Sequence, residues 1–184
     1  GEPVNRLEDS RLLTGTACFV DDLKLPNMAS MAVFRSPHGH ARINRIDLSK
    51  VRDMDGVIDA FYAADVEGEL PLIPLRLAPF AGFERFLQRP LAIDKVRYAG
   101  EPIAVIVAEN RYIAEDALER IDIDYEALPA VTTVDQAAAG DILIHEDAGE
   151  NMGTRYTVSR GDCDAAFANA DYTRKEKFFT NRHG

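Results

Sequence analysis

Apolar positions along the central part of the chain change from a strand-like to a helix-like period and back. Residues 103–108 form an uninterrupted apolar run that is rich in β-branched side chains, which predicts a buried strand. Residues 111–120 place apolar side chains on one helical face, and Asn110 stands at the expected N-cap position. Residues 121–125 alternate apolar and polar side chains, as a strand with one buried face does. A strand–helix–strand unit with connections this short favours parallel pairing of its two strands.

Further elements are predicted on both sides of this central unit. Apolar, β-branched or alternating stretches predict strands at residues 29–35, 41–47, 57–62, 154–159 and 172–180. Short helices are predicted at residues 9–13, 50–54, 135–139 and 162–168. Strands that flank one strand–helix–strand unit are typical of an α+β domain with a mixed sheet, and not of a doubly wound fold.

Residues 66–90 differ from the rest because they combine four prolines with many large apolar side chains. The prolines are Pro71, Pro74, Pro79 and Pro90, and the apolar residues are Leu70, Leu72, Ile73, Leu75, Leu77, Phe80, Phe83, Phe86 and Leu87. A solvated linker does not carry such a load of apolar side chains. The segment is therefore expected to pack against its own domain or against a partner surface.

The 184 residues carry a formal net charge of -10, and the acidic residues are spread along the chain. This distribution argues against nucleic-acid binding, which needs a basic face, and against docking to an anionic membrane. No apolar run approaches the length of a membrane span, and the polar first residues do not form a signal peptide. Cys18 and Cys163 are far apart and belong to no CxxC motif, which is compatible with reduced thiols in a cytoplasmic protein. Both ends of the sequence look cut from a longer chain.

Few residues suggest chemistry of their own. Ser36, His38 and His40 raise the hypotheses of a nucleophile with its base, or of two metal ligands that lack a third, but their sequence is typical of a packing turn. Glu101 stands between a glycine and a proline, so it is either a turn residue or a carboxylate that faces a cleft; we favour the turn. Residues 145–147 are interpreted as an exposed acidic loop. Phosphate-binding loops and metalloprotease motifs are absent from the sequence.

Seven segments occur in the same order as in a known family, although each is weakly specific alone. Together they resemble the molybdenum-binding large subunit of the xanthine dehydrogenase, aldehyde oxidase and carbon monoxide dehydrogenase family. The segments are residues 6–22 (with RLEDSRLLTG and FVDD), 34–43 (FRSPHGHARI), 56–66 (GV…ADV), 89–92 (RPLA), 96–104 (VRYAGEPIA), 123–131 (IDYEALPAV) and 161–167 (GDCDAAF). The resemblance covers nearly the whole chain.

This resemblance implies an α+β fold called the α/β-hammerhead, which in the family precedes two larger domains that hold most of the molybdopterin cofactor. The family's enzymes hydroxylate aldehydes or N-heterocycles, or oxidise carbon monoxide, with water as the oxygen source. Their electrons pass to iron–sulfur clusters and often to FAD on partner subunits or domains. The chain is accordingly divided into an N-terminal extension (1–27), the hammerhead core (28–140), a peripheral strand–helix–strand segment (141–180) and the truncated start of the molybdopterin-binding domain (181–184).

The resemblance also limits which functional residues this chain contains. Asn181 stands where many members carry a glutamine that hydrogen-bonds an oxygen ligand of the metal, so Asn181 is the cofactor-binding candidate of the full-length protein. The family's glycine-rich cofactor loops and catalytic glutamate would follow Gly184. The chain alone is therefore expected to be non-catalytic, to hold no cofactor or metal, and to serve as a structural, channel-lining and docking domain.

The expected partners are the remaining domains of the large subunit and the iron–sulfur and flavin subunits of an oligomeric complex. The sequence is compatible with two alternatives. One is a free-standing protein-interaction module without enzymatic activity. The other is an independent hydrolase that would use Ser36 and His40.

Overall fold

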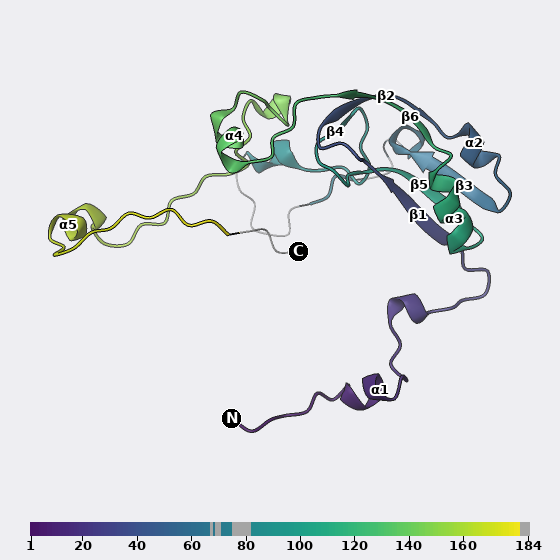
Figure 1. Cartoon of the computed structure of the whole chain (residues 1–184), viewed down its shortest axis with the longest axis horizontal. Coiled ribbons are helices and arrows are strands. Elements are labelled where there is room, and N and C mark those ends of the chain that lie inside the picture. Colours follow the sequence, from purple (N-terminus) through teal and green to yellow (C-terminus); the bar gives the residue numbers. More distant parts are fainter. Residues whose placement is uncertain (67, 69–70, 75–81, 181–184) are drawn as a thin grey trace. The chain divides into compact units, whose positions relative to one another are not determined.

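The computed structural model describes residues 1–66, 68, 71–74 and 82–180, and its internal contacts divide the chain into two units, Gly1–Gly153 and Thr154–Gly184. The first unit contains all the sheet structure of the described residues (Figure 1). Within those residues, every helix is too short or too polar to cross a membrane.

The first sheet of this unit is built around β5 (Pro102–Ala108), which lies between β1 (Ser30–Arg35) and β3 (Val57–Tyr62). Both neighbours run antiparallel to β5. Ile103 and Ile106 of β5 are fully buried, which confirms the buried strand that the apolar run predicts. A central strand that is covered on both faces needs such a run, whereas an edge strand does not.

One face of this sheet is covered by two helices, α3 (Arg111–Leu118) and α2 (Ser49–Arg52) (Figure 1). The predicted N-cap is confirmed, because Asn110 Oδ1 accepts a hydrogen bond of 3.1 Å from the N–H of Ile113. Ala114 and Ala117 are completely buried, and such small side chains let α3 approach the strands closely. The core cluster at this interface consists of Leu48, Val51, Ala60, Ala104, Ile106 and Ala117.

The second sheet has β2 (Ala41–Asp47) between β4 (Lys95–Val96) and β6 (Asp122–Ala127), and both pairings are again antiparallel. Its apolar face packs on Ile103 of β5, which joins the two sheets into one core. Its other face is polar, and the exposed ion pair between Arg45 and Asp122 lies there at 2.7 Å. This division matches the alternation that predicted β6.

The α+β class is confirmed, but the expected parallel pairing and the mixed sheet are wrong. β5 and β6 lie in different sheets, and all pairings among the described strands are antiparallel. The reason is that β1 and β3 occupy both edges of β5. The chain leaves α3 toward β2, where β6 can bury its single apolar face.

The described part of residues 66–90 packs on its own unit, as one of the two expectations had it. The short helix η3 (Phe83–Phe86) lies against η4 (Glu146–Ala148). Arg85 Nη1 donates a 2.7 Å hydrogen bond to the carbonyl of Ala148. The prediction also included five residues that lie outside the described part of the chain: Leu70, Leu75, Leu77, Pro79 and Phe80. The remaining 3-10 turn of this region is η2 (Ala63–Val66).

Two further short elements follow β6 and precede the end of the first unit. Helix α4 (Val134–Ala139) begins with a capping box of Thr133 and Gln136, and it ends at Gly140 in the left-handed region, as predicted. Asn151 ties this helix to the following turn, because its Nδ2 donates to the carbonyls of Ala137 (3.3 Å) and Ile142 (2.7 Å).

The N-terminal residues form only α1 (Asp9–Leu13) and the 3-10 turn η1 (Val20–Asp22), neither of which contains a buried residue. In the second unit, α5 (Cys163–Ala168) is present and Asp162 caps it. The strands predicted at 154–159 and 172–180 are wrong, because these residues are exposed and form no strand. Alternation of apolar and polar side chains is compatible with a strand that has one buried face. It does not show that another strand is available to form the backbone hydrogen bonds. The structure divides the chain after Gly153. The domain boundaries given from the sequence remain a prediction.

Candidate functional site

A cavity of about 220 Å³, here called the polar cavity, lies between the chain segment around residues 85–97 and the turn at 145–147. Its apolar wall is made by Leu72, Leu87, Leu91, Ala92 and Ile93. Its polar lining consists of Arg85, Gln88, Arg89, Asp94, Arg97, Glu101, His145 and Asp147. Polar side chains therefore predominate over a smaller apolar wall, and polar groups that converge on a cavity can orient a small molecule.

Glu101 is the most deeply buried acid of this cavity, with 7% of its surface exposed. It sits in the tight turn before β5, where Gly100 adopts a φ of +91°. Its Oε2 accepts a 2.5 Å hydrogen bond from the N–H of Arg97. Burial raises the pKa of Glu101, while the hydrogen bond from Arg97 and its positive charge oppose that rise. Glu101 is therefore both a turn residue and a carboxylate that lines a cavity, so the two interpretations from the sequence are compatible.

Arg97 and Lys95 bring two cations to the same region, and the sequence did not single out either of them. The Arg97 guanidinium donates to main-chain carbonyls, at 3.2 Å to Ile144 and at 3.4 Å to Lys95. Lys95 is 6% exposed and its ammonium forms an ion pair with Glu146. The hydrogen bond from Lys95 lowers the pKa of Glu146. Glu146 is largely exposed, so solvent screening keeps the contribution of this pair to stability small.

His145 is half-buried, so the expectation of an exposed loop at 145–147 is wrong for this residue. Its ring packs edge-on against Phe86, with 5.4 Å between the ring centroids. Burial, and then the positive charge of Arg97, lower the pKa of His145. Residues 145–147 are partly covered because η3 packs against them. The polar sequence of these residues does not predict that contact.

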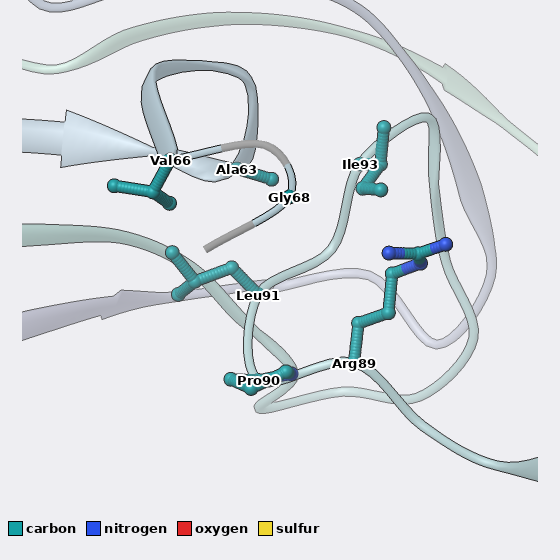
Figure 2. A pocket seen from close by; sticks show the side chains of 7 residues that line it. All are labelled: Ala63, Val66, Gly68, Arg89, Pro90, Leu91 and Ile93. Atoms are coloured by element: carbon teal, nitrogen blue, oxygen red, sulfur yellow. The ribbon is translucent and has the colours of Figure 1, made fainter. Parts of the chain in front are cut away.

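A second and smaller pocket adjoins the polar cavity and shares Arg89, Leu91 and Ile93 with it. Figure 2 shows its lining, which is Ala63, Val66, Gly68, Arg89, Pro90, Leu91 and Ile93. Its volume of about 20 Å³ accommodates a single water molecule and no organic ligand. The polar cavity is therefore the better candidate for binding.

Ser36, His38 and His40 form a packed turn and not a catalytic pair. The Ser36 hydroxyl donates to the carbonyl of His38 at 2.9 Å and accepts from its N–H at 3.0 Å. The His40 Nδ1 lies 2.8 Å from the carbonyl oxygen of Pro129, so it must carry the proton and donate it. The His38 ring packs against Tyr125 at a centroid distance of 4.8 Å. The packing interpretation of these residues is confirmed.

Metal binding finds no support among the described residues. No group of three or more His, Cys, Asp or Glu side chains that could hold a metal occurs there. Cys18 and Cys163 are both free and exposed. Asn181, the cofactor-binding candidate, lies outside the described residues, so its contact stays a prediction.

The comparison with known families assigns this fold. A family model described as "Aldehyde oxidase and xanthine dehydrogenase, a/b hammerhead domain" matches residues 14–129, which is more than half of the chain. The chain therefore belongs to the α/β-hammerhead family of aldehyde oxidases and xanthine dehydrogenases.

Individual relatives agree with this assignment. The chain is 38% identical to the 6-hydroxypseudooxynicotine dehydrogenase complex subunit gamma of Paenarthrobacter nicotinovorans, over 100% of this chain and 23% of that protein. It is 35% identical to the carbon monoxide dehydrogenase large chain of Afipia carboxidovorans, over 96% of this chain and 23% of the relative. The crystal structure of quinoline 2-oxidoreductase from Pseudomonas putida 86 matches with a TM-score of 0.79 and 35% identity, over 91% of this chain and 21% of that one. The chain thus spans less than a quarter of the length of these relatives.

Proposed function

We propose that this chain is the non-catalytic hammerhead domain of the large subunit of a molybdopterin-dependent oxidoreductase. The parent enzyme would hydroxylate aldehydes or N-heterocycles, or oxidise carbon monoxide, with water as the oxygen source. The observation that carries this proposal is that the whole chain aligns with less than a quarter of a catalytic-complex subunit. A chain that matches one region so completely is expected to do what that region does.

The described residues support a structural role for the domain in such a subunit. The packed turn of Ser36 and His40 leaves no nucleophile with a base at that turn. Glu101 and Arg97 are hydrogen-bonded to the main chain, and the buried Lys95 is paired with Glu146. In contrast, large apolar side chains are exposed at both ends of the described residues. Leu7, Leu13, Val20, Phe178 and Phe179 are each more than 80% exposed. Such side chains are expected to be covered by other domains or subunits.

The proposal extends to cofactors, partners and location. We infer that molybdopterin is bound by the remaining domains of the large subunit, that iron–sulfur clusters and FAD lie on partner subunits or domains, and that the complex is an oligomer in the cytoplasm. Asn181 would contact the cofactor in the full-length protein. Replacement of Asn181 by Ala in that protein should lower its activity, whereas Asn181→Gln should retain it, because the longer amide makes the same hydrogen bond.

The test compares the chain of residues 1–184 with the complete subunit. Elemental analysis should find molybdenum in the purified complete complex and none in residues 1–184, and only the complex should reduce a dye with an aldehyde or a heterocycle. Stoichiometric molybdopterin binding by residues 1–184 would overturn the non-catalytic assignment. A coding sequence that stops after Gly184 would favour the alternative of a free-standing interaction module.

A further inference from the structure

The polar cavity presents charges that the described residues leave without an ionic partner. Arg89 is exposed and forms no hydrogen bond or ion pair with any described residue. Arg97 donates to two carbonyls, so hydrogen bonds hold its guanidinium while no carboxylate of the described residues neutralises it in an ion pair. Guanidinium groups in this state are suited to a carboxylate, which they bind through charge-assisted hydrogen bonds.

The same cavity also contains a negatively charged hydrogen-bond acceptor, the buried Glu101 carboxylate. One oxygen of the buried Glu101 carboxylate accepts the Arg97 N–H. The main-chain N–H of Tyr98 also stabilises this carboxylate, and because a carboxylate has about four lone-pair sites, Glu101 can accept a further N–H or O–H. Asp94 and Asp147 add two exposed carboxylates at the lining. A simple anion would meet repulsion from these acids, whereas a molecule that carries both an anionic end and a donor end satisfies both sets of groups.

Size and composition narrow the class of ligand further. A volume of about 220 Å³ is below the roughly 300 to 1,000 Å³ of pockets that hold drug-sized ligands. The side chains of Leu87, Leu91 and Ile93 supply an apolar wall. The acids do not form a metal site with their described neighbours. The remaining candidate is a small organic acid with an apolar body.

We propose that the polar cavity binds a small organic acid that carries one carboxylate, an apolar body and one N–H or O–H donor. The carboxylate lies toward Arg89 and Arg97, the donor toward Glu101, and the body against the leucines of the wall. The carboxylate comes either from a free acid or from a side chain elsewhere in the large subunit. The second source rests on the proposed function, whereas binding of a free acid to residues 1–184 does not depend on it.

The probe is 4-hydroxybenzoate, titrated into ¹⁵N-labelled protein of residues 1–184 and followed by NMR. Saturable shifts are expected at the amides of Arg97, Glu101 and His145. The uncharged 4-hydroxybenzamide should bind about tenfold more weakly, because it loses the charge-assisted hydrogen bonds. Benzoate, which lacks the hydroxyl donor, should fall between them. No saturation up to about 10 mM, or equal binding of acid and amide, overturns the proposal.

A matched pair of variants tests the residues. Arg89→Ala should weaken binding of 4-hydroxybenzoate about tenfold. Arg160→Ala, at an exposed arginine of the second unit, should leave it unchanged. Because both side chains are exposed, both variants are expected to fold, and unchanged spectra away from the cavity verify this. Wild-type affinity in Arg89→Ala would overturn the proposal.

A parallel titration of the complete subunit distinguishes the two sources of the carboxylate. Binding to both proteins identifies a free acid as the ligand. Binding to residues 1–184 that is absent from the complete subunit shows that the subunit itself covers the cavity, which is the result expected if a carboxylate side chain of the subunit is the source. Both results support the carboxylate chemistry. The molybdenum analysis described above can fail without affecting this titration, so the two proposals are tested separately.

Discussion

The turn between α2 and β3 should be unusually sensitive to a single methyl group at Gly56. Its φ of +82° lies in the left-handed region, where an L side chain costs about 1 to 2 kcal/mol. A Cβ at this position would also lie only 2.5 Å from Ile113 Cδ1 of helix α3. Moving the end of that side chain out of its rotamer costs about 0.5 to 1.5 kcal/mol more. Gly56→Ala should therefore lower the free energy of unfolding by about 1.5 to 3.5 kcal/mol.

Two further variants separate these contributions. Gly100→Ala has a similar φ of +91° and open space around the new Cβ, so it should show only the backbone cost. Ile113→Val removes Cδ1 and therefore the clash. In the Ile113→Val protein, Gly56→Ala should lower the free energy of unfolding by less than it does in the wild type, and the difference is the contribution of the clash. Urea unfolding followed by far-UV circular dichroism measures these free energies, because the chain has no tryptophan. Equal losses in both glycine variants, with no coupling to Ile113, would refute the packing of α3 on this turn.

Three other substitutions test the cavity, the α4 region and the α3 cap. Burial raises the pKa of Glu101, so the folded state holds this proton more tightly than the unfolded chain does. Stability should therefore fall as the pH rises from the ordinary carboxyl pKa through the pKa of the folded state. Glu101→Gln should remove that fall and stabilise the protein at pH 7, as measured by thermal unfolding. Asn151→Ala removes three hydrogen bonds to the main chain and should cost about 2 to 3 kcal/mol, with faster hydrogen exchange at the amide of Ile144. Asn110→Ala should cost about 1 kcal/mol in urea unfolding.

Each of these has a control and a contrary outcome. Glu119→Gln, at an exposed acid, should leave the pH profile unchanged, and a Glu101→Gln protein that is less stable than wild type at pH 7 contradicts the argument from burial. Asn5→Ala should have no effect on stability. If Asn151→Ala has no effect either, the stabilising role of the Asn151 hydrogen bonds is disproved. Asn110→Ser keeps a capping oxygen and should restore the lost stability; equal loss in Ala and Ser would argue against the cap.

The polar cavity shows why site prediction from sequence stopped short. Glu101 could be noticed because a glycine and a proline flank it beside a buried strand. Arg97 and Arg89 could not, because an arginine in a polar stretch is usually solvated. Their role depends on the turn around His145, about 50 residues further along the chain, which lies against them only after η3 and η4 have packed. A cavity formed by segments this far apart leaves no periodic signal.

The local pattern of side chains was sufficient for the elements of the core and for the family. The apolar run of β5, the capped helix α3 and the alternation of β6 each follow from interactions within a few residues, and ordered motifs revealed the hammerhead domain. Strand pairing was decided by the tertiary structure, because backbone hydrogen bonds join residues that are distant in sequence. The occupied edges of β5 sent β6 to a second, antiparallel sheet, and residues 154–159 and 172–180 did not become strands because no described neighbour pairs with them.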